Sequence, residues 1–480
     1  MTEIAEFLLD DTRKRLPAVM NSLGQRIINN ECSLFLGSGM SLNSNLPSWH
    51  QLLKPCADEL NLNIEAVHDL FSLAQYYANV KSESNLRRIV GEQISLLAHA
   101  TNVHDRLISS GFKSIWTTNY DHLIEQSLQA QGIAYNPIIS DSDLANVTYQ
   151  GKVNVYKING DISRREEMVL TRGDIERYNR THKLFLTFLR KELVSNTFLF
   201  VGYSFSDGIV LDCLSEIRDY LKLQTSFTTH YALMVINGTE DDSIKYKIDD
   251  LKRRYGIDCL FILKDQFESF IDLLWRRLRY KKVFISGAYH FLSEEEEHFA
   301  DSLSEKIVRK LYSEHFRIST GIGKRLGAFI TGYANQYLIA NGYTNTSQYL
   351  SMRPFPFHLL LDETTKVKYR TIMQKDCDSA IFMFGRSETT SKEGPYEQIG
   401  HYSRGVYQEY QIAKSMGSII IPLGSTGYEA QIIWQEVKNN INEYPYLSKK
   451  IDALGTTKDP ECLSEILISI LNECARHNAV

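Results

Sequence analysis

Short apolar, β-prone runs alternate along the chain with longer stretches of helical periodicity. The apolar runs end in Gly, Ser or Asn, as strands that lead into turns do. Strands separated by helices are typical of parallel sheets with crossover connections, so the pattern predicts an α/β fold. In the first part of the chain we expect strands at residues 32–36, 114–117, 153–158, 197–201, 230–236 and 259–263.

A basic run at residues 276–282 closes a helix that we expect at residues 266–279. A helix C-terminus favours cations through its dipole, so we interpret this run as a helix end rather than an anion site. A new series of strands opens directly afterwards and continues at residues 316–320, 379–384 and 418–423. We therefore predict two Rossmann-like, doubly wound parallel-sheet domains, at residues 1–280 and 281–480.

Composition narrows the possible functions. The 480 residues carry 53 basic and 58 acidic side chains, a net charge of −5, without a long basic stretch. Nucleic-acid phosphates require clustered Lys and Arg, so nucleic acid is excluded as the main partner. No apolar segment approaches the roughly 20 residues that cross a bilayer, so we expect no membrane partner. The seven cysteines are dispersed and the N-terminus lacks a secretory pattern, which together predict a cytoplasmic protein.

Polar clusters follow four of the strands predicted for the first domain. Ligands of open parallel sheets bind outside the carboxyl ends of the strands, so the clusters are expected to converge on one crevice. Small residues at positions 37 to 39 would let the backbone approach a pyrophosphate, although such a turn is often purely structural. The clusters are Gly37-Ser38-Gly39-Met40-Ser41, Thr118-Asn119-Tyr120-Asp121, Lys157-Ile158-Asn159-Gly160-Asp161 and Gly202-Tyr203-Ser204-Phe205-Ser206-Asp207.

The ordered set of four clusters resembles the SIR2-like family over roughly residues 20–275. Members of this family bind NAD in the crevice and cleave its bond between nicotinamide and ribose. The resemblance implies that Asn119 and Asp121 hold the nicotinamide ribose and the attacking water. It also implies that the phosphates are contacted by Gly37, Ser38, Gly39 and Ser41. The adenosine side would be lined by Gly202, Ser204 and Asp207.

One position departs from the family pattern. Where the family has Lys-x-His-Gly-Asp, this chain has Lys157-Ile158-Asn159-Gly160-Asp161. The family histidine acts as a general base, and an amide lacks the basicity for that task. Ligand binding is therefore expected to survive better than turnover. Asn159 is either a natural variant of low activity or an engineered substitution; we favour the second explanation and describe the function of the form with histidine restored. We expect His122 to be a surface residue that does not replace the missing base.

Protein deacylases of the SIR2 superfamily carry a zinc ribbon with two Cys-x-x-Cys pairs, which this chain lacks. Water is then the expected nucleophile, which gives ADP-ribose and nicotinamide as products. The acidic run at residues 294–297 follows Ser293, and we interpret it as the capped start of a helix rather than a metal site. We expect the protein to need no metal.

The second domain has its own strand ends with small residues, at positions 286–288, 319–323 and 422–427. Nearby arginines and one glutamate suit phosphate and ribose groups. These segments resemble the SLOG domain, a sensor of nucleotide-derived signals, over roughly residues 282–475. By that resemblance the signal would be bound by Arg370, Arg404, Gly405 and Glu409, with Ser286 and Gly287 beside it.

A SIR2-like domain followed by SLOG resembles the effector family of Thoeris anti-phage defence. In that family a cyclic ADP-ribose isomer, made by a TIR-domain protein, binds SLOG and activates NAD hydrolysis, which aborts the infection. The resemblance also implies a homo-oligomer, a tetramer or a larger assembly. Two alternatives remain: a module that binds NAD or a nucleotide signal without chemistry and, less favoured, an NAD-dependent deacylase.

Overall fold

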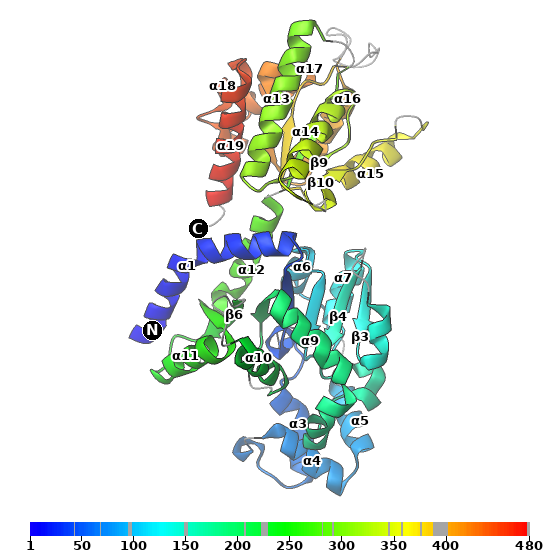
Figure 1. Ribbon diagram of the computed structural model, residues 1–480, viewed down its shortest axis with the longest axis vertical. Helices are drawn as coiled ribbons and strands as arrows, with labels where there is room; N and C mark the ends of the chain where they lie inside the picture. Colours follow the sequence, from blue (N-terminus) through cyan, green and yellow to red (C-terminus); the bar gives the residue numbers. More distant parts are fainter. Residues whose placement is uncertain are drawn as a thin grey trace. The chain divides into compact units, whose positions relative to one another are not determined.

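The computed structural model divides the chain into two compact units, Met1–Trp275 and Arg276–Val480, drawn in Figure 1. The structure describes all residues except 43, 68, 95–97, 148–151, 206–207, 222–228, 281, 290–291, 344–345, 357–358, 375–376, 387–401 and 478–480, and the side chains of 221, 276–280, 348 and 475–477.

The first unit contains a parallel sheet with the strand order β3-β4-β2-β1-β5-β6-β7. Its strands are β1 (Cys32–Leu36), β2 (Ser114–Thr117), β3 (Tyr135–Ile138), β4 (Val153–Lys157), β5 (Thr197–Val201), β6 (His230–Ile236) and β7 (Ile257–Leu263). The direction of winding reverses at β1, and the carboxyl ends of strands at such a reversal form a crevice that can take a ligand.

Helices connect these strands and flank the sheet (Figure 1). They are α1 (Glu3–Ile28), α2 (Ser38–Leu42), α3 (Trp49–Glu59), α4 (Leu70–Val80), α5 (Glu83–Ile94), α6 (Asn102–Ser109), α7 (Leu123–Ala130), α8 (Arg172–Thr181), α9 (Lys183–Ser195), α10 (Gly208–Leu221), α11 (Ser243–Tyr255) and α12 (Phe267–Tyr280). The helices α3, α4 and α5 form a small core of their own, built around Leu53, Leu73 and Val90.

Aromatic residues lie opposite one another across four central strands. Trp116 of β2 is the register partner of Tyr156 on β4 and of Phe35 on β1, and Phe35 is in turn the partner of Phe200 on β5. The rings of Trp116 and Tyr156 stack with centroids 4.0 Å apart, and those of Phe35 and Phe200 are 5.0 Å apart. Such cross-strand pairs stabilise a sheet and fix its register.

The second unit contains a parallel sheet of order β10-β9-β8-β11-β12, which reverses at its first strand, β8. Its strands are β8 (Lys282–Ser286), β9 (Arg317–Thr320), β10 (Leu350–Met352), β11 (Ser379–Phe382) and β12 (Ile419–Pro422). Its helices are α13 (Glu294–Ser313), α14 (Leu326–Ala340), α15 (Glu363–Gln374), α16 (Arg404–Ser415), α17 (Tyr428–Asn439), α18 (Ile451–Thr456) and α19 (Pro460–His477).

The predicted α/β class with two doubly wound parallel sheets is confirmed. The capped helix after Ser293 is also confirmed, because Ser293 and Glu296 form a reciprocal capping box at the start of α13. Two strands were not predicted, β3 and β10. Both are short strands at a sheet edge, and β3 contains Pro137, which only an edge strand tolerates readily.

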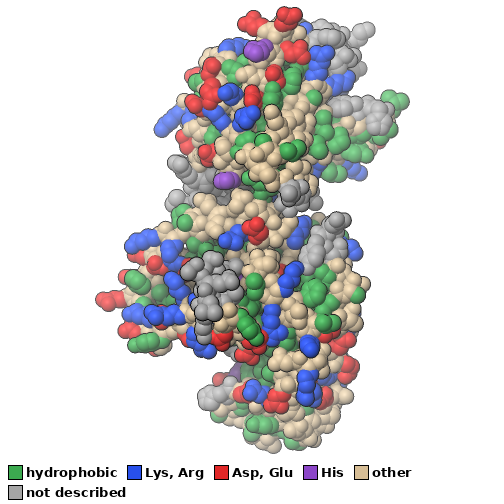
Figure 2. Space-filling model, viewed as in Figure 1, with side chains coloured by type: hydrophobic (Ala, Val, Ile, Leu, Met, Phe, Trp, Pro, Cys, Tyr) green, Lys and Arg blue, Asp and Glu red, His purple; other side chains and the backbone are tan. Residues whose placement is uncertain are grey.

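Charged side chains are mixed on the surface. On the face drawn in Figure 2, Lys and Arg are interspersed with Asp and Glu over both units. Among the helices in the described part of the chain, none combines the length and the apolar character that spanning a bilayer requires.

Two glycines offer a matched test of how the strand ends pack. Gly202 and Gly132 both have φ near +66°, but a Cβ on Gly202 would lie 2.8 Å from the Met40 amide nitrogen, whereas one on Gly132 would meet nothing within 4 Å. Gly132→Ala should lower the free energy of unfolding by about 1–2 kcal/mol because of its positive φ alone. Gly202→Ala should lower it by about a further 1–3 kcal/mol through overpacking. Urea denaturation followed by tryptophan fluorescence measures both, and equal losses would contradict the close packing.

Candidate active site

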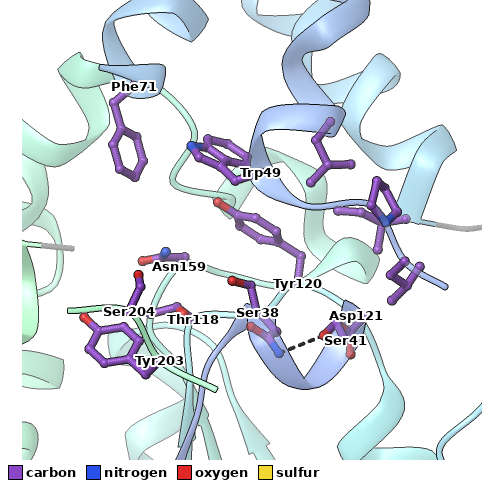
Figure 3. Close-up of a pocket in the computed structure, with 15 residues that line it drawn as sticks. Ser38, Ser41, Trp49, Phe71, Thr118, Tyr120, Asp121, Asn159, Tyr203 and Ser204 are labelled. Atoms are coloured by element: carbon purple, nitrogen blue, oxygen red, sulfur yellow. Dashed lines mark hydrogen bonds between the residues drawn. The ribbon is translucent and has the colours of Figure 1, made fainter. Parts of the chain in front are cut away.

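A cavity of about 140 Å³ lies at the carboxyl ends of β1, β2, β4 and β5. Helices α3 and α4 contribute Trp49 and Phe71 to its apolar wall (Figure 3). The described residues that line it are Ser38, Ser41, Leu46, Pro47, Trp49, Leu52, Phe71, Ile94, Thr118, Asn119, Tyr120, Asp121, Asn159, Tyr203 and Ser204. All four strand-end clusters therefore contribute residues to one cavity, as predicted.

Asn119 lines this cavity and carries an unpaired acceptor. Its Nδ2 donates to the carbonyl of Gly37 at 3.1 Å and to Ser41 Oγ at 2.9 Å. A carbonyl can only accept, so the amide nitrogen must face Gly37 and the oxygen Oδ1 must face away from it. Oδ1 is buried and has no hydrogen-bond partner within the described structure. A ligand hydroxyl or a water can donate to it there.

Ser41 and Asp121 hold Asn119 in this orientation. Ser41 Oγ donates to Asp121 Oδ2 at 2.6 Å, so its lone pairs are turned toward the Asn119 amide. The other carboxylate oxygen, Asp121 Oδ1, accepts from the backbone amide of Leu123 at 3.1 Å. Asp121 therefore acts on the site through Ser41, and both of its oxygens already have donors.

Asn159 lies across the cavity from Asp121 and is 6% exposed (Figure 3). Its backbone carbonyl accepts from the Val169 amide at 2.8 Å, and its side-chain Oδ1 is a second buried oxygen without a partner in the described structure. The turn needs Gly160, which has φ near +89° and whose added Cβ would lie 2.7 Å from the carbonyl oxygen of Glu167. The backbone of residue 159 is thus held in place, while its side-chain oxygen makes no hydrogen bond within the described structure.

A buried ion cluster lies beside the cavity. The ammonium of Lys157 contacts Asp161 and lies 3.3 Å from Glu125. Burial alone would lower the pKa of Lys157, but the two carboxylates raise that pKa above its ordinary value. Burial would raise the pKa of Asp161, yet the hydrogen bond from His122 and the charge of Lys157 hold that pKa well below its usual range.

His122 is a surface residue that also contacts this ion cluster. Its side chain is 44% exposed, as expected, but Nε2 lies 2.9 Å from Asp161 Oδ1. This contact could not be predicted from the sequence, because it joins the connection after β2 to the connection after β4. His122 does not line the cavity, and nothing in the described contacts makes it a replacement for a base at position 159.

The glycine turn after β1 packs against the turn after β5. The amides of Gly37 and Gly39 donate to the carbonyls of Val201 and Gly202, at 3.0 and 2.9 Å. The expected phosphate role for these two amides therefore competes with bonds inside the protein. The glycines are needed for another reason, since added Cβ atoms would collide with the Gly202 backbone.

A larger cavity of about 880 Å³ adjoins the first. Ser38, Tyr203 and Ser204 line both cavities, so the two share a wall at the strand reversal. The larger one extends past Gly39 and Gly202 to Lys247 of α11 and to the start of α12. Lys264 and Asp265, in the 3₁₀ helix Lys264–Gln266 that precedes α12, also line it. Two further residues were predicted as contacts. The carbonyl of Gly37 accepts a hydrogen bond from Asn119, and Asp207 lies outside the described residues.

The second unit has a small cavity of about 50 Å³ at the ends of β8 and β9. Five of the predicted signal-binding residues line it: Ser286, Gly287, Arg370, Gly405 and Glu409. Arg404 does not line this cavity; it is exposed at the start of α16, between two residues that do.

Arg370 and Glu409 form the charged wall of this small cavity. Arg370 Nε lies 3.7 Å from Glu409 Oε1, and Ser286 Oγ donates to Glu409 Oε2 at 2.6 Å. Burial raises the pKa of Glu409, against the opposing effects of Ser286 and Arg370. The guanidinium of Arg370 also lies 4.3 Å from the ring centroid of Phe355 and donates to Gln408 at 2.7 Å.

The sequence analysis assigned no role to several residues that shape these cavities. Tyr120 stands inside a strand-end cluster without a role of its own, and the others are Trp49 and Phe71 in the first unit and Phe355 and Met373 in the second. Phe71 and Met373 lie on helices with ordinary amphipathic spacing, where a cavity-lining residue looks like a core residue. Within the described residues, no group of three or more His, Cys, Asp or Glu side chains could hold a metal ion.

Two family models match the chain. Residues 113–260 match the SIR2-like domain, and residues 269–474 match the Sir2- and TIR-associating SLOG family. The chain is 32% identical to "NAD(+) hydrolase ThsA" of Cytobacillus dafuensis, covering 88% of this chain and 89% of that protein. Proteins of the same name from Acinetobacter baumannii and Bacillus cereus are each 29% identical, covering 89% and 94% of this chain and 91% and 95% of theirs.

The pair of His122 and Asp161 predicts a pH-dependent contribution to stability. The hydrogen bond to Asp161 raises the pKa of His122 although partial burial opposes it, so the folded state binds this proton more tightly than the unfolded chain. The contribution is present below the ordinary pKa of about 6.5 and is lost as the pH rises through the raised value. His122→Gln should therefore lower the free energy of unfolding near pH 6 by no more than about 1 kcal/mol, because the imidazole is about half exposed.

Urea denaturation of both proteins between about pH 5.5 and pH 9 measures this difference. The gap between parent and His122→Gln should narrow as the pH rises. A gap that stays constant or widens toward high pH would contradict the ion pair.

Proposed function

Because the chain belongs to the ThsA family of NAD(+) hydrolases, with a SIR2-like and a SLOG domain, we propose that it binds NAD+ across the first sheet and hydrolyses it when histidine stands at position 159. The reaction is NAD+ plus water giving ADP-ribose, nicotinamide and a proton. The second domain is the control element of this activity.

One observation carries the proposal: Asn119, which lines the cavity where four strand ends meet, carries a buried amide oxygen without a partner in the described structure. Asn119 Oδ1 is held there by Ser41 and Gly37, and Asn159 adds a second unpaired oxygen. A buried acceptor without a partner is costly, which is a reason to expect a ligand that donates to it. The ribose hydroxyls and the attacking water of an NAD+ hydrolase are such donors.

The adjoining cavities suit the two halves of a dinucleotide. Apolar and aromatic residues such as Trp49, Phe71 and Tyr120 form a wall for the nicotinamide half in the smaller cavity. The larger cavity takes the adenosine half, past Gly202 and Ser204. This leaves the glycosidic bond near Asn119, where its amide oxygen can position water against the ribose carbon as nicotinamide leaves.

Asn159 should weaken catalysis by this chain much more than it weakens ligand binding. Loss of a positioned base reduces a rate by about 10²- to 10⁴-fold, while the contacts that hold substrate persist. The cavity supplies one carboxylate among its described lining residues, Asp121, and that carboxylate is already occupied by Ser41 and Leu123. A second candidate function follows from the same residue: a module that binds NAD+ or a signal nucleotide without chemistry.

We further propose that a cyclic ADP-ribose isomer binds in the second unit and activates the first. Arg370 would pair with its phosphates, and Glu409 would accept from ribose hydroxyls once the ligand displaces Ser286. Arg404 is exposed between Ser403 and Gly405, which line the same cavity, and would add a contact there. A TIR-domain protein would supply the signal during phage infection, and the chain would act as a tetramer or a larger homo-oligomer in the cytoplasm.

Asn159→His should raise the release of nicotinamide from NAD+ by about 10²- to 10⁴-fold, because it restores a general base at the cavity. Mass spectrometry of the products, with and without cyclic ADP-ribose isomers, measures this. Asn119→Ala in the same background should remove the gain, since the water and ribose contacts depend on its amide. NAD+ binding without turnover in the Asn159→His protein, with every isomer, would favour the silent binding module instead.

Arg370→Gln should abolish activation by the cyclic nucleotide and leave the basal rate of the Asn159→His protein unchanged. Arg386 is a matched control, because its guanidinium also lies over an aromatic ring, that of Tyr428, but it does not line the cavity. Activation curves for Arg370→Gln and Arg386→Gln separate the two arginines. An Arg370→Gln protein that responds to the isomer like its parent would overturn this assignment of the sensor site.

A further inference from the structure

The ion cluster beside the active site has no role in the reaction described above. Lys157, Asp161 and Glu125 are only 1%, 2% and 6% exposed, and none of them lines the cavity. His122 closes the cluster on its outer side, with Nε2 at 2.9 Å from Asp161 Oδ1. Taking these charges out of water is costly, so the arrangement calls for a physical explanation.

The cluster joins the two connections that carry the functional side chains. Lys157 ends β4, two residues before Asn159, and its ammonium donates to the backbone carbonyl of Asp121 in the connection after β2. Asp161 follows Asn159 and accepts from the Ser163 amide at 2.7 Å. The two connections meet again where the Ile162 amide donates to the Tyr120 carbonyl at 3.0 Å.

Stability alone is a poor explanation for such a cluster. Buried ion pairs are often no more stabilising than apolar residues of the same volume, but they allow only a narrow set of geometries. Displacing a binding group by about 1 Å can cost on the order of 100-fold in function. A rigid ionic link between the Asn119 connection and the Asn159 connection would prevent such a displacement.

We propose that Lys157 and Asp161 are positioning residues, which hold the connections after β2 and β4 at the separation that a dinucleotide in the cavity requires. This inference rests on the proposal that the cavity binds NAD+. Lys157 fixes the carbonyl of Asp121, and Asp161 fixes the turn that follows Asn159. The oxygens of Asn119 and Asn159 are thereby set relative to each other.

Calorimetric titration of NAD+ into the full chain and into Asp161→Asn tests the proposal. The dissociation constant reports the geometry of the site, and the stoichiometry reports the folded fraction. Asp161→Asn should raise Kd by about 10- to 100-fold with a stoichiometry equal to that of the parent.

Glu192→Gln is the matched control, because Glu192 is a buried carboxyl of the same unit that contacts Ser33 of β1 instead. Its Kd should stay within about twofold of the parent value.

A purely structural role would lower the stoichiometry and leave Kd unchanged, which would overturn the proposal. Glu125→Gln provides a second, milder variant, since Glu125 holds Lys157 from α7 and one of its oxygens has no partner in the described structure. It should also raise Kd.

If neither variant folds, the cluster is a requirement of the fold and the proposal is wrong. If the parent chain and its Asn159→His form both fail to bind NAD+, the proposed function fails first and this inference falls with it.

Discussion

A row of aromatic rings across four parallel strands is the constraint on which the site depends. Because the rings of adjacent strands lie opposite one another, the strands cannot slip by one residue without turning this row to the other face of the sheet. The same register makes Leu36 the partner of both Thr117 and Val201, and Thr117 the partner of Lys157. Four strands therefore end on one line, and the polar residues that follow them are delivered to one cavity. The row consists of Tyr156, Trp116, Phe35 and Phe200.

Close packing of backbone turns is the second condition. The turns after β1 and β5 touch through Gly37, Gly39 and Gly202, and side chains there would push the two turns apart. This packing aligns the carbonyl of Gly37 with the side-chain NH2 of Asn119, which leaves the Asn119 oxygen turned away from Gly37. The glycines thus shape the site through contacts within the protein, in addition to any contact they make with a ligand.

The sequence predicted the central strands closely because buried parallel strands are continuous apolar runs with polar residues at their ends. It could not predict the edge strands β3 and β10, which are short, or the contact of His122 with Asp161, which joins segments 39 positions apart in the chain. The strand-end residues of the first site were found because each follows a strand directly. Phe71 of the aromatic wall was missed because it lies on a helix whose apolar spacing fits a core equally well. Arg404 was grouped with the cavity residues through the resemblance to the SLOG domain, and the structure leaves it outside their lining.

The central claim is that a dinucleotide lies across the carboxyl ends of the first sheet, with its glycosidic carbon beside the Asn119 amide. A crystal structure of the full chain with NAD+ tests it most directly, because Asn159 should slow turnover enough to preserve the ligand. The account predicts nicotinamide against the aromatic wall, adenosine in the larger cavity, and a ribose hydroxyl or water within hydrogen-bond distance of Asn119 Oδ1. An empty cavity between Asn119 and Asn159, with NAD+ bound only elsewhere on the chain, would contradict it.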